Sequence, residues 1–325
     1  MAVNGVEKAL AGNAVKKAKL KNGVRKAWGE NGVKKAGLED GAKKAGLEDG
    51  AKKAGLGAVR VLIALLLAIE VYPVLWLVMS SFKTTVEFAI EPMFAFPKNL
   101  LYFDNYVYAW TMGKVGILFK NTVIVTLASL FLVLLLSSAA AFALSKMRWK
   151  LAGTVSLLFR LGMFIPSFVL LLPQFLMYKD MGILNTLWAL IVAFGCNTSL
   201  AVYLLTGFYR YIPDEIMEAS IIDGCNIYSY FFRIAVPLSK NGYVTVMMLT
   251  FFNIWNNLLI SQTFVSSQSQ KMLQAGLASY LDSQIGREWG PTFAAISIAV
   301  IPTVVIYLAL NKRIMEGVAA GAVKG

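Results

Sequence analysis

Residues 121–149 read NTVIVTLASLFLVLLLSSAAAFALSKMRW, and this stretch decides the class of the protein. Its first 25 residues carry no charged side chain, whereas a helix needs only about 20 apolar residues to cross a bilayer. Lys146, Arg148 and Lys150 follow directly, and basic clusters of this kind accumulate at the cytoplasmic ends of spans. The stretch therefore predicts a membrane-spanning helix whose C-terminal end faces the cytoplasm.

The rest of the chain has the same apolar character. Hydrophobic residues make up 58% of its 325 residues and charged residues 15%, whereas soluble domains have about half and a quarter. Six apolar segments are long enough to span a membrane, and they are 59–81, 117–145, 152–178, 184–209, 242–264 and 291–311. We predict an all-α, multi-pass membrane protein in which 58–325 form a domain of six transmembrane helices.

The composition excludes several kinds of chemistry. The chain has no histidine, which rules out Ser-His and Cys-His nucleophiles and His-ligated metal sites within it. Its two cysteines, Cys196 and Cys225, predict neither a disulfide framework nor a thiolate cluster. No phosphate-binding loop of the form G-x-x-x-x-G-K-[ST] occurs. We therefore expect no catalytic residue, metal or cofactor in this chain.

Residues 1–57 differ from the rest, because they contain six nonapeptides with the theme N/D-G-hydrophobic-K-K-A. Nine residues turn a helix by about 900°, so the apolar positions change face in each block. Each glycine also costs a helix roughly 1 kcal/mol. We predict a basic, mobile cytoplasmic tail, which is either a neutral repeat expansion or a segment that attracts anionic lipid headgroups.

The net charge of +13 fits a topological explanation better than nucleic-acid binding. Residues 1–60 carry 14 Lys and Arg against 6 Asp and Glu, and together with the cluster at 146–150 they place both termini in the cytoplasm. On the opposite side, 82–116 predict an aromatic-rich interfacial segment. Residues 265–290 predict a polar loop that could reach a ligand or partner.

The segment 211–240 reads YIPDEIMEASIIDGCNIYSYFFRIAVPLSK. Pro213 suits a first helical turn, Asp214 and Glu215 favour a helix start, and Gly224 favours a helix stop. We predict two short helices joined at Gly224 on the cytoplasmic face. Apolar side chains beside four acids indicate a surface that binds another protein, because interfacial membrane helices are usually rich in Lys and Arg.

One spacing in this segment runs Glu218-Ala219-Ser220-x3-Gly224-x9-Ile234-x2-Pro237. It closely resembles the EAA loop of permease subunits in binding-protein-dependent ABC importers, E-A-A-x3-G-x9-I-x-L-P, with departures at Ser220 and Val236. The stretch 121–149, the pair Trp255-Asn256 and the terminal GAVKG resemble the carbohydrate-uptake branch. In particular, they resemble the second permease subunit of maltose-type importers.

The resemblance implies a transport subunit, not an enzyme, that moves a sugar or oligosaccharide into the cytoplasm by alternating access. The implied partners are a second permease subunit, two ATPase subunits, an external solute-binding protein and the inner-membrane bilayer of a prokaryote. It implies that 265–290 probe the sugar cleft of the binding protein and that 321–325 touch the ATPases. The implied ATPase-coupling residues are Glu218, Ala219, Ser220, Asp223, Gly224, Ile234 and Pro237.

Polar residues of the predicted fifth span share one helix face. At 100° per residue, Thr250, Asn253, Asn256, Asn257 and Ser261 fall within about 140°. Such groups either bond to neighbouring helices or line a cavity. Amides offer donors and acceptors that match sugar hydroxyls, so we expect a substrate path. Its candidate residues are Thr250, Asn253, Asn256 and Asn257, with Asn197 in a weaker patch of the fourth span.

Two charged residues lie within spans, Glu70 and Arg160. Each needs a partner, protonation or a side chain that reaches the interface, and a Glu70–Arg160 pair is one solution. Two other functions stay open at this point. One is import of another solute, such as a polyamine or glycerol phosphate, and the other is a channel or receptor scaffold.

Overall fold

The computed structural model describes residues 56–57, 59–281 and 288–322, and all regular elements among them are helices. The all-α class is therefore confirmed. Almost all of the predicted tail 1–57 and the end of the GAVKG motif lie outside the described residues. After a helix Val59–Ser80, the elements are α2 (Thr85–Ile90), α3 (Asp104–Thr111), α4 (Val115–Lys146), α5 (Ala152–Gly162), η1 (Ser167–Leu170), α6 (Leu171–Asp180), α7 (Leu187–Gly195), α8 (Ser199–Arg210), α9 (Asp214–Ile222), α10 (Ile227–Tyr230), the π-helical η2 (Phe231–Ala235), α11 (Val236–Leu238), α12 (Lys240–Trp255), α13 (Leu259–Phe264), η3 (Gln268–Gln270), α14 (Leu273–Leu281) and α15 (Trp289–Ala322).

The chain divides into two compact units, with the boundary after Val74. The helix Val59–Ser80 crosses this boundary, and its most apolar window has no buried residue. The unit that begins at Leu75 contains all the other helices and three apolar clusters. The Glu70–Arg160 pair stays a prediction, because the two residues belong to separately described units.

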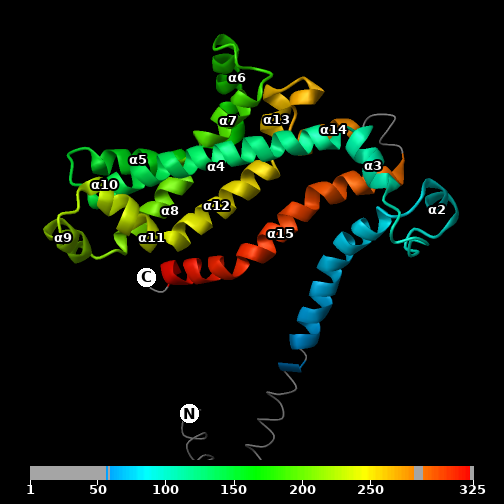
Figure 1. Ribbon diagram of the computed structural model, residues 1–325, viewed down its shortest axis with the longest axis horizontal. Coiled ribbons are helices and arrows are strands. Elements are labelled where there is room, and N and C mark those ends of the chain that lie inside the picture. The colour runs from blue at the N-terminus through cyan, green and yellow to red at the C-terminus, as the bar shows by residue number, and fades with distance from the viewer. Residues whose placement is uncertain (1–55, 58, 282–287, 323–325) are drawn as a thin grey trace, which may run out of the picture. The chain divides into compact units, whose positions relative to one another are not determined.

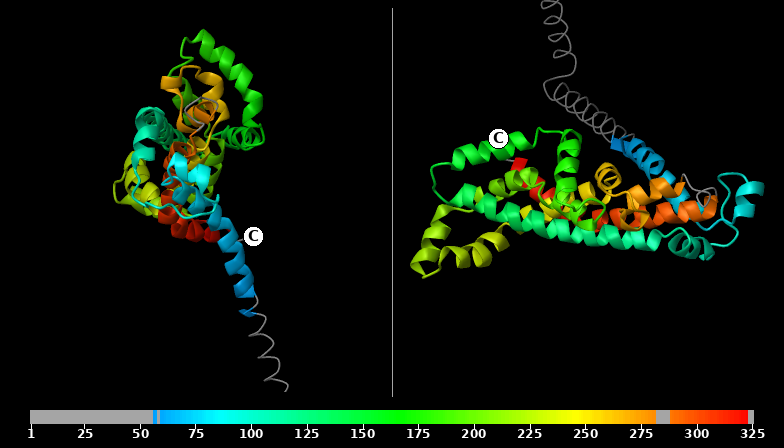
Figure 2. Two further views of the ribbon diagram at one scale, coloured as in Figure 1. Left: turned by 90° about the vertical axis from the view of Figure 1, so that its right-hand side faces the viewer. Right: turned by 90° about the horizontal axis from the view of Figure 1, so that it is seen from above.

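Helix α4 organises the second unit. It contacts α3, α5, α7, α8, α12 and α14, and Figures 1 and 2 show the 211–240 segment at one of its ends and α3 at the other. Small polar side chains allow the neighbouring helices to approach closely. Ser129 and Ser137 are fully buried, and Ser129 Oγ donates to the carbonyl of Ile191 on α7 at 3.3 Å. Small residues at helix contacts are typical of membrane bundles.

Three apolar clusters join the helices around α4. One contains Phe194 of α7 and Phe264 of α13. The second contains Trp255 of α12, whose Nε1 donates to the carbonyl of Ala299 on α15 at 3.1 Å. The third connects α4 and α8 to the 211–240 segment through Phe142 and its neighbours.

Two of the expected spans are bent. Ala152–Gly162 and Ser167–Asp180 make an angle of 97°, and Leu187–Gly195 and Ser199–Arg210 make one of 41°. The described residues contain three helices long and apolar enough to span, or up to five if each bent pair is one span, so the count of six is not confirmed. The sharper bend has a local cause. Pro166 is extended, with φ −63° and ψ 132°, and a proline disfavours helical backbone in the residue before it.

The expected span 242–264 is interrupted, which corrects the prediction of one continuous polar stripe. Helix α12 ends at Trp255 and α13 begins at Leu259. Asn257 Oδ1 accepts a hydrogen bond from the N–H of Ile260 at 2.9 Å, and Asn256 Nδ2 donates to the carbonyl of Phe252 at 3.1 Å. Asparagine side chains compete for backbone groups in this way, so the residues expected to extend the stripe divide it.

The segment 265–290 is not the simple polar loop that we expected. It contains η3 and α14, and Met272 and Leu273 are fully buried. Side chains of α4 and α13 bond to its backbone in place of water. The four bonds run from Asn121 Nδ2 to the carbonyls of Ser269 and Lys271, from the N–H of Met272 to Ser261 Oγ, and from the N–H of Leu273 to Thr122 Oγ1.

The start of α15 lies too close to its neighbours for a side chain at Gly290. A Cβ there would be 2.6 Å from the carbonyl oxygen of Lys83 and 2.6 Å from Asn105 Nδ2. We expect Gly290→Ala to lower the thermal unfolding temperature of the detergent-purified protein, because overpacking costs about 1–3 kcal/mol. Gly153→Ala is the control, since a Cβ at that position meets nothing within 4 Å. Equal unfolding temperatures for the two variants would contradict the close approach.

Candidate functional site

The 211–240 segment has the two-helix form that the sequence predicts. Helix α9 is followed by α10, η2 and α11, which run without interruption from Ile227 to Leu238. Between the two parts Gly224 has a φ of +85°, a conformation that costs other residues about 1–2 kcal/mol. Pro213 differs from the prediction, because it is the extended residue before α9, with ψ 143°, and not part of the first turn.

Lys146, the last residue of α4, holds the start of this segment. Its Nζ donates to the carbonyl of Ile212 at 2.5 Å and to Asp214 Oδ1 at 2.6 Å, and its side chain is only 3% exposed. The hydrogen bond and the positive charge of Lys146 lower the pKa of Asp214 from its usual 3.8. The pair is therefore complete above that usual value and is lost only as the pH falls through the lowered pKa. We call these contacts the Lys146 bridge.

The inner face of the segment packs against α4 and α8. Tyr230 is fully buried, and the ring of Phe142 contacts the rings of Tyr209, Tyr230 and Phe231 at centroid distances of 5.7, 6.0 and 5.0 Å. Met217 of α9 packs against the same cluster. The segment is therefore fixed to the helix bundle by both an ion pair and apolar contacts.

The outer face exposes most of the residues predicted to bind a partner. Glu218, Ala219, Asp223, Gly224 and Pro237 are exposed, Ile234 is half-buried and Ser220 is buried. Ser220 Oγ donates to the carbonyl of Met217 at 2.7 Å, so it contributes inside the segment. Ile222 and Tyr228 are 85% and 73% exposed. A surface that combines exposed apolar groups with acids is suited to binding another protein.

A second site lies between α8 and α12. Asn197, Thr250 and Asn253 line a cavity of about 190 Å³, together with apolar side chains such as Phe194 and Leu249. We call it the amide cavity. The break between α7 and α8, which contains Asn197, allows this side chain to reach the same space as the two residues of α12. The cavity offers amide and hydroxyl groups, and no charged side chain lines it among the described residues.

The amide cavity contains only part of the predicted substrate path. Thr250 and Asn253 share the cavity, and Asn197, which we expected in a separate and weaker patch of the fourth span, lies with them. Asn256 and Asn257 do not line the cavity, because they lie in the break after α12. The direction of the helix face was predictable from a period of 3.6 residues, but the point at which the helix ends was not.

Sequence reasoning missed the Lys146 bridge. From the sequence, Lys146 indicated only that the end of its span faces the cytoplasm, and Asp214 indicated only that a helix starts nearby. The two residues are 68 positions apart, so no local spacing pairs them. The available signal was their similar depth, because a basic cluster ends one predicted span and an acid opens the segment on the same side.

What these sites offer is hydrogen bonding and contact surface. Over the part of the chain that the structure describes, no group of three or more His, Cys, Asp or Glu side chains is arranged to hold a metal ion. Cys196 and Cys225 are both free thiols, exposed and half-buried respectively. The functional question is therefore what these surfaces bind.

Comparisons with known proteins all indicate a component of a membrane transport system. The family model described as "Binding-protein-dependent transport system inner membrane component" matches residues 133–318, which include the 211–240 segment and the amide cavity. The diacetylchitobiose uptake system permease protein NgcG of Streptomyces coelicolor is 32% identical over 255 residues, or 78% of this chain and 84% of that protein. The melibiose/raffinose/stachyose import permease protein MelC of Bacillus subtilis is 30% identical over 82% of this chain and 96% of its own.

A solved structure has the same fold. It is a bacterial ABC transporter involved in the import of the acidic polysaccharide alginate, and one of its chains superposes with a TM-score of 0.69. The sequence identity is 20%, and the match covers 79% of this chain and 95% of the other. At this identity the similarity concerns the fold.

The Lys146 bridge can be tested by its effect on α9. We expect Lys146→Met to speed up amide hydrogen exchange in α9 by about fivefold, because a net hydrogen bond is worth about 1 kcal/mol. Asp214→Asn should have a smaller effect, since the bond from Lys146 to Ile212 remains. Lys150→Met, at an exposed lysine of the α4–α5 connection, is the control. Unchanged exchange in Lys146→Met would mean that apolar packing alone holds the segment.

Proposed function

Because the chain belongs to the family of binding-protein-dependent transport system inner membrane components, we propose that it is the permease subunit that moves a sugar or an oligosaccharide into the cytoplasm of a prokaryote. The observation that carries the choice of solute is the amide cavity, which is neutral and lined by groups that both donate and accept hydrogen bonds. Two relatives whose names specify the uptake of diacetylchitobiose and of melibiose, raffinose and stachyose support it.

The charge of the amide cavity argues against the other solutes. A polyamine is a polycation and needs carboxylates, and glycerol phosphate is an anion and needs Lys or Arg. Neither kind of side chain lines the cavity among the described residues. The family consists of transport-system components, which argues against the alternative of a channel or receptor scaffold.

The 211–240 segment is the proposed docking surface for an ATPase. Glu218 would meet a basic group on that partner, and Ala219, Asp223 and Gly224 would lie in the contact, since all are exposed. Ser220 and Ile234 would shape the segment from inside. In this proposal ATP is hydrolysed by two separate subunits, and the chain pairs with a second permease and receives its solute from an external binding protein.

The two sites are joined by short, continuous helices. Helix α8 begins next to Asn197 and ends at Arg210, where the 211–240 segment begins. Helix α12 begins where the segment ends and carries Thr250 and Asn253. Twelve residues of α8 span about 18 Å. A displacement of the segment would therefore move both walls of the amide cavity, which is what alternating access requires.

The orientation is also proposed. The segment and both termini would face the cytoplasm, in agreement with the Lys and Arg bias. Residues 1–57, nearly all outside the described residues, would form a basic cytoplasmic tail apart from the 58–325 membrane domain.

Sugar transport through the amide cavity can be tested with paired asparagine variants. We expect Asn253→Leu and Asn197→Leu to slow sugar uptake into reconstituted vesicles by about five- to tenfold, because each removes about one hydrogen bond to the solute. Asn256→Leu is the matched control, since Asn256 has the same chemistry three residues away and does not line the cavity. If Asn256→Leu slows uptake as much as Asn253→Leu, the cavity is not the path.

Coupling can be tested at Glu218 and Gly224. We expect Glu218→Ala and Gly224→Asp to reduce ATPase copurification by tenfold or more and to uncouple ATP hydrolysis from uptake, because one removes a charge partner and the other strains the turn. Solute binding to the external protein should not change.

The controls separate docking from general damage. Glu215→Ala removes another exposed acid of α9. Gly182→Asp introduces a comparable strain, since Gly182 has a φ of +68°, but in the α6–α7 connection. Wild-type copurification and coupling in both Glu218→Ala and Gly224→Asp would exclude this segment as the coupling element.

A further inference from the structure

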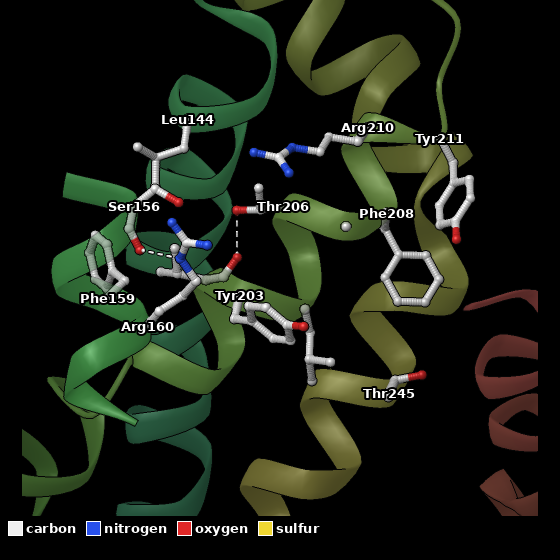
Figure 3. Close-up of a pocket in the computed structure, with 13 residues that line it drawn as sticks. Leu144, Ser156, Phe159, Arg160, Tyr203, Thr206, Phe208, Arg210, Tyr211 and Thr245 are labelled. Atoms are coloured by element: carbon white, nitrogen blue, oxygen red, sulfur yellow. Dashed lines mark hydrogen bonds between the residues drawn. The ribbon is translucent and has the colours of Figure 1, made fainter. Parts of the chain in front are cut away.

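A cavity of about 440 Å³ is lined by residues of α4, α5, α8 and α12 and by Tyr211, and none of the residues proposed for the transport path or for ATPase docking lines it. Its walls are mainly apolar and include Leu144, Phe159 and Val202. Two arginines, Arg160 of α5 and Arg210 of α8, also line it, and we call it the arginine cavity. Figure 3 shows both guanidinium groups directed into the space beside Thr206.

Among the residues that the structure describes, neither guanidinium group has an acidic partner. No carboxylate lines the cavity among the described residues, and neither arginine belongs to a salt bridge within them. The contact that fixes Arg160 is a bond from its Nε to the carbonyl of Ser156 at 3.3 Å. Ser156 is one turn earlier, so the side chain runs back along α5 toward the α4–α5 connection. Two cations thus line one space to which the described part of the chain contributes no anion.

Arg160 and Arg210 are both exposed, so a charge at the position of Arg160 within a membrane would face lipid or a partner unless an anion pairs with it. Arg160 lies nine residues into α5, within a segment that is apolar enough for a membrane span. Charged residues at such positions pair, reach toward the interface or contact a ligand. Guanidinium groups bind phosphate oxygens with two parallel hydrogen bonds, so two arginines that share a space form a suitable phosphate site.

The surroundings favour an anion that carries an apolar tail. Helix α5 has no buried residue, although it contacts α4 and α8. The arginine cavity therefore lies behind a helix of which no residue is buried by the described part of this chain. Lys146, Arg148 and Lys150 precede α5, so this end of the bundle is basic. Basic pockets between spanning helices bind the headgroups of anionic lipids.

We propose that the arginine cavity binds the headgroup of an anionic phospholipid from the leaflet that surrounds the 211–240 segment. The phosphate lies between Arg160 and Arg210, and an acyl chain follows the apolar groove formed by Phe159 and Leu144. The lipid thereby ties α5 to α8, whose last residue leads into the segment. A free phosphate ion offers the same charge but leaves the apolar walls unfilled. A helix of a second permease would fill the walls but would have to bring a carboxylate.

The binding of a lipid can be measured on the assembled transporter. The complete complex is purified in detergent and titrated with phosphatidylglycerol or with phosphatidylcholine of the same acyl chains, and the bound lipids are counted by native mass spectrometry. We expect tighter binding of phosphatidylglycerol. Each of Arg160→Gln and Arg210→Gln should weaken it by about fivefold and the double variant by about thirtyfold, since an arginine beside an anionic membrane surface contributes about 1 kcal/mol, which is about fivefold in affinity.

Controls separate this site from general charge effects. Arg148→Gln removes an exposed arginine at the same end of the bundle that does not line the cavity, and it should weaken phosphatidylglycerol binding less than Arg160→Gln or Arg210→Gln does. Arg160→Lys should keep most of the affinity for phosphatidylglycerol, because the charge remains. If the double variant fails to assemble, the comparison of the two lipids on the wild type still tests whether the complex prefers the anionic lipid.

Three results would overturn the proposal. The first is equal binding of phosphatidylglycerol and phosphatidylcholine, or equal binding by the double variant and the wild type. The second is full displacement of phosphatidylglycerol by inorganic phosphate at the same concentration, which would indicate a site for a free anion. The third is a crosslink from a cysteine placed at Thr206 to the second permease, which would mean that a protein chain fills the cavity.

Discussion

Backbone amide and carbonyl groups inside a bilayer have no water to bind, so a spanning helix can be broken only where the protein itself supplies partners. This requirement explains the polar side chains of the second unit. Asn121 and Thr122 of α4 bond to the backbone around η3 and α14, Ser261 bonds to the same stretch, and Asn257 accepts a hydrogen bond from the N–H of Ile260 in α13. The irregular segments are therefore held in place by α4, and the helix contacts on which both proposed sites depend follow from that.

The sequence predicted what depends on composition and on local chemistry. Long apolar runs predicted the helix Val59–Ser80, α4 and α15, and Gly224 predicted the turn of the 211–240 segment, because a positive φ is a property of one residue. Hydropathy did not predict the breaks at Asn256 and between α5 and α6, since both lie within apolar runs. The Lys146 bridge and the meeting of Asn197 with Asn253 depend on long-range packing, which no residue spacing encodes.

The helices of the second unit differ in how firmly they are packed. Helices α4, α8 and α12 bury aromatic and small side chains against one another at the base of the 211–240 segment, and α8 and α12 also line the amide cavity. Helix α5 has no buried residue, and the chain bends by 97° between it and the segment Ser167–Asp180 that contains α6. In the proposed transport cycle, a conformational change that starts at the segment would therefore be transmitted through α8 and α12, while α5 would follow according to what fills the space behind it.

The burial of Lys146 has a consequence for its chemistry. Lysine amines of membrane proteins that face the aqueous phase react readily with acylating reagents, whereas the amine of Lys146 is enclosed and engaged in two hydrogen bonds. It becomes available only when α9 separates from the end of α4. The rate at which an acylating reagent modifies this one amine therefore reports whether the segment is attached to the bundle at each stage of a transport cycle. The measurement needs no engineered residue.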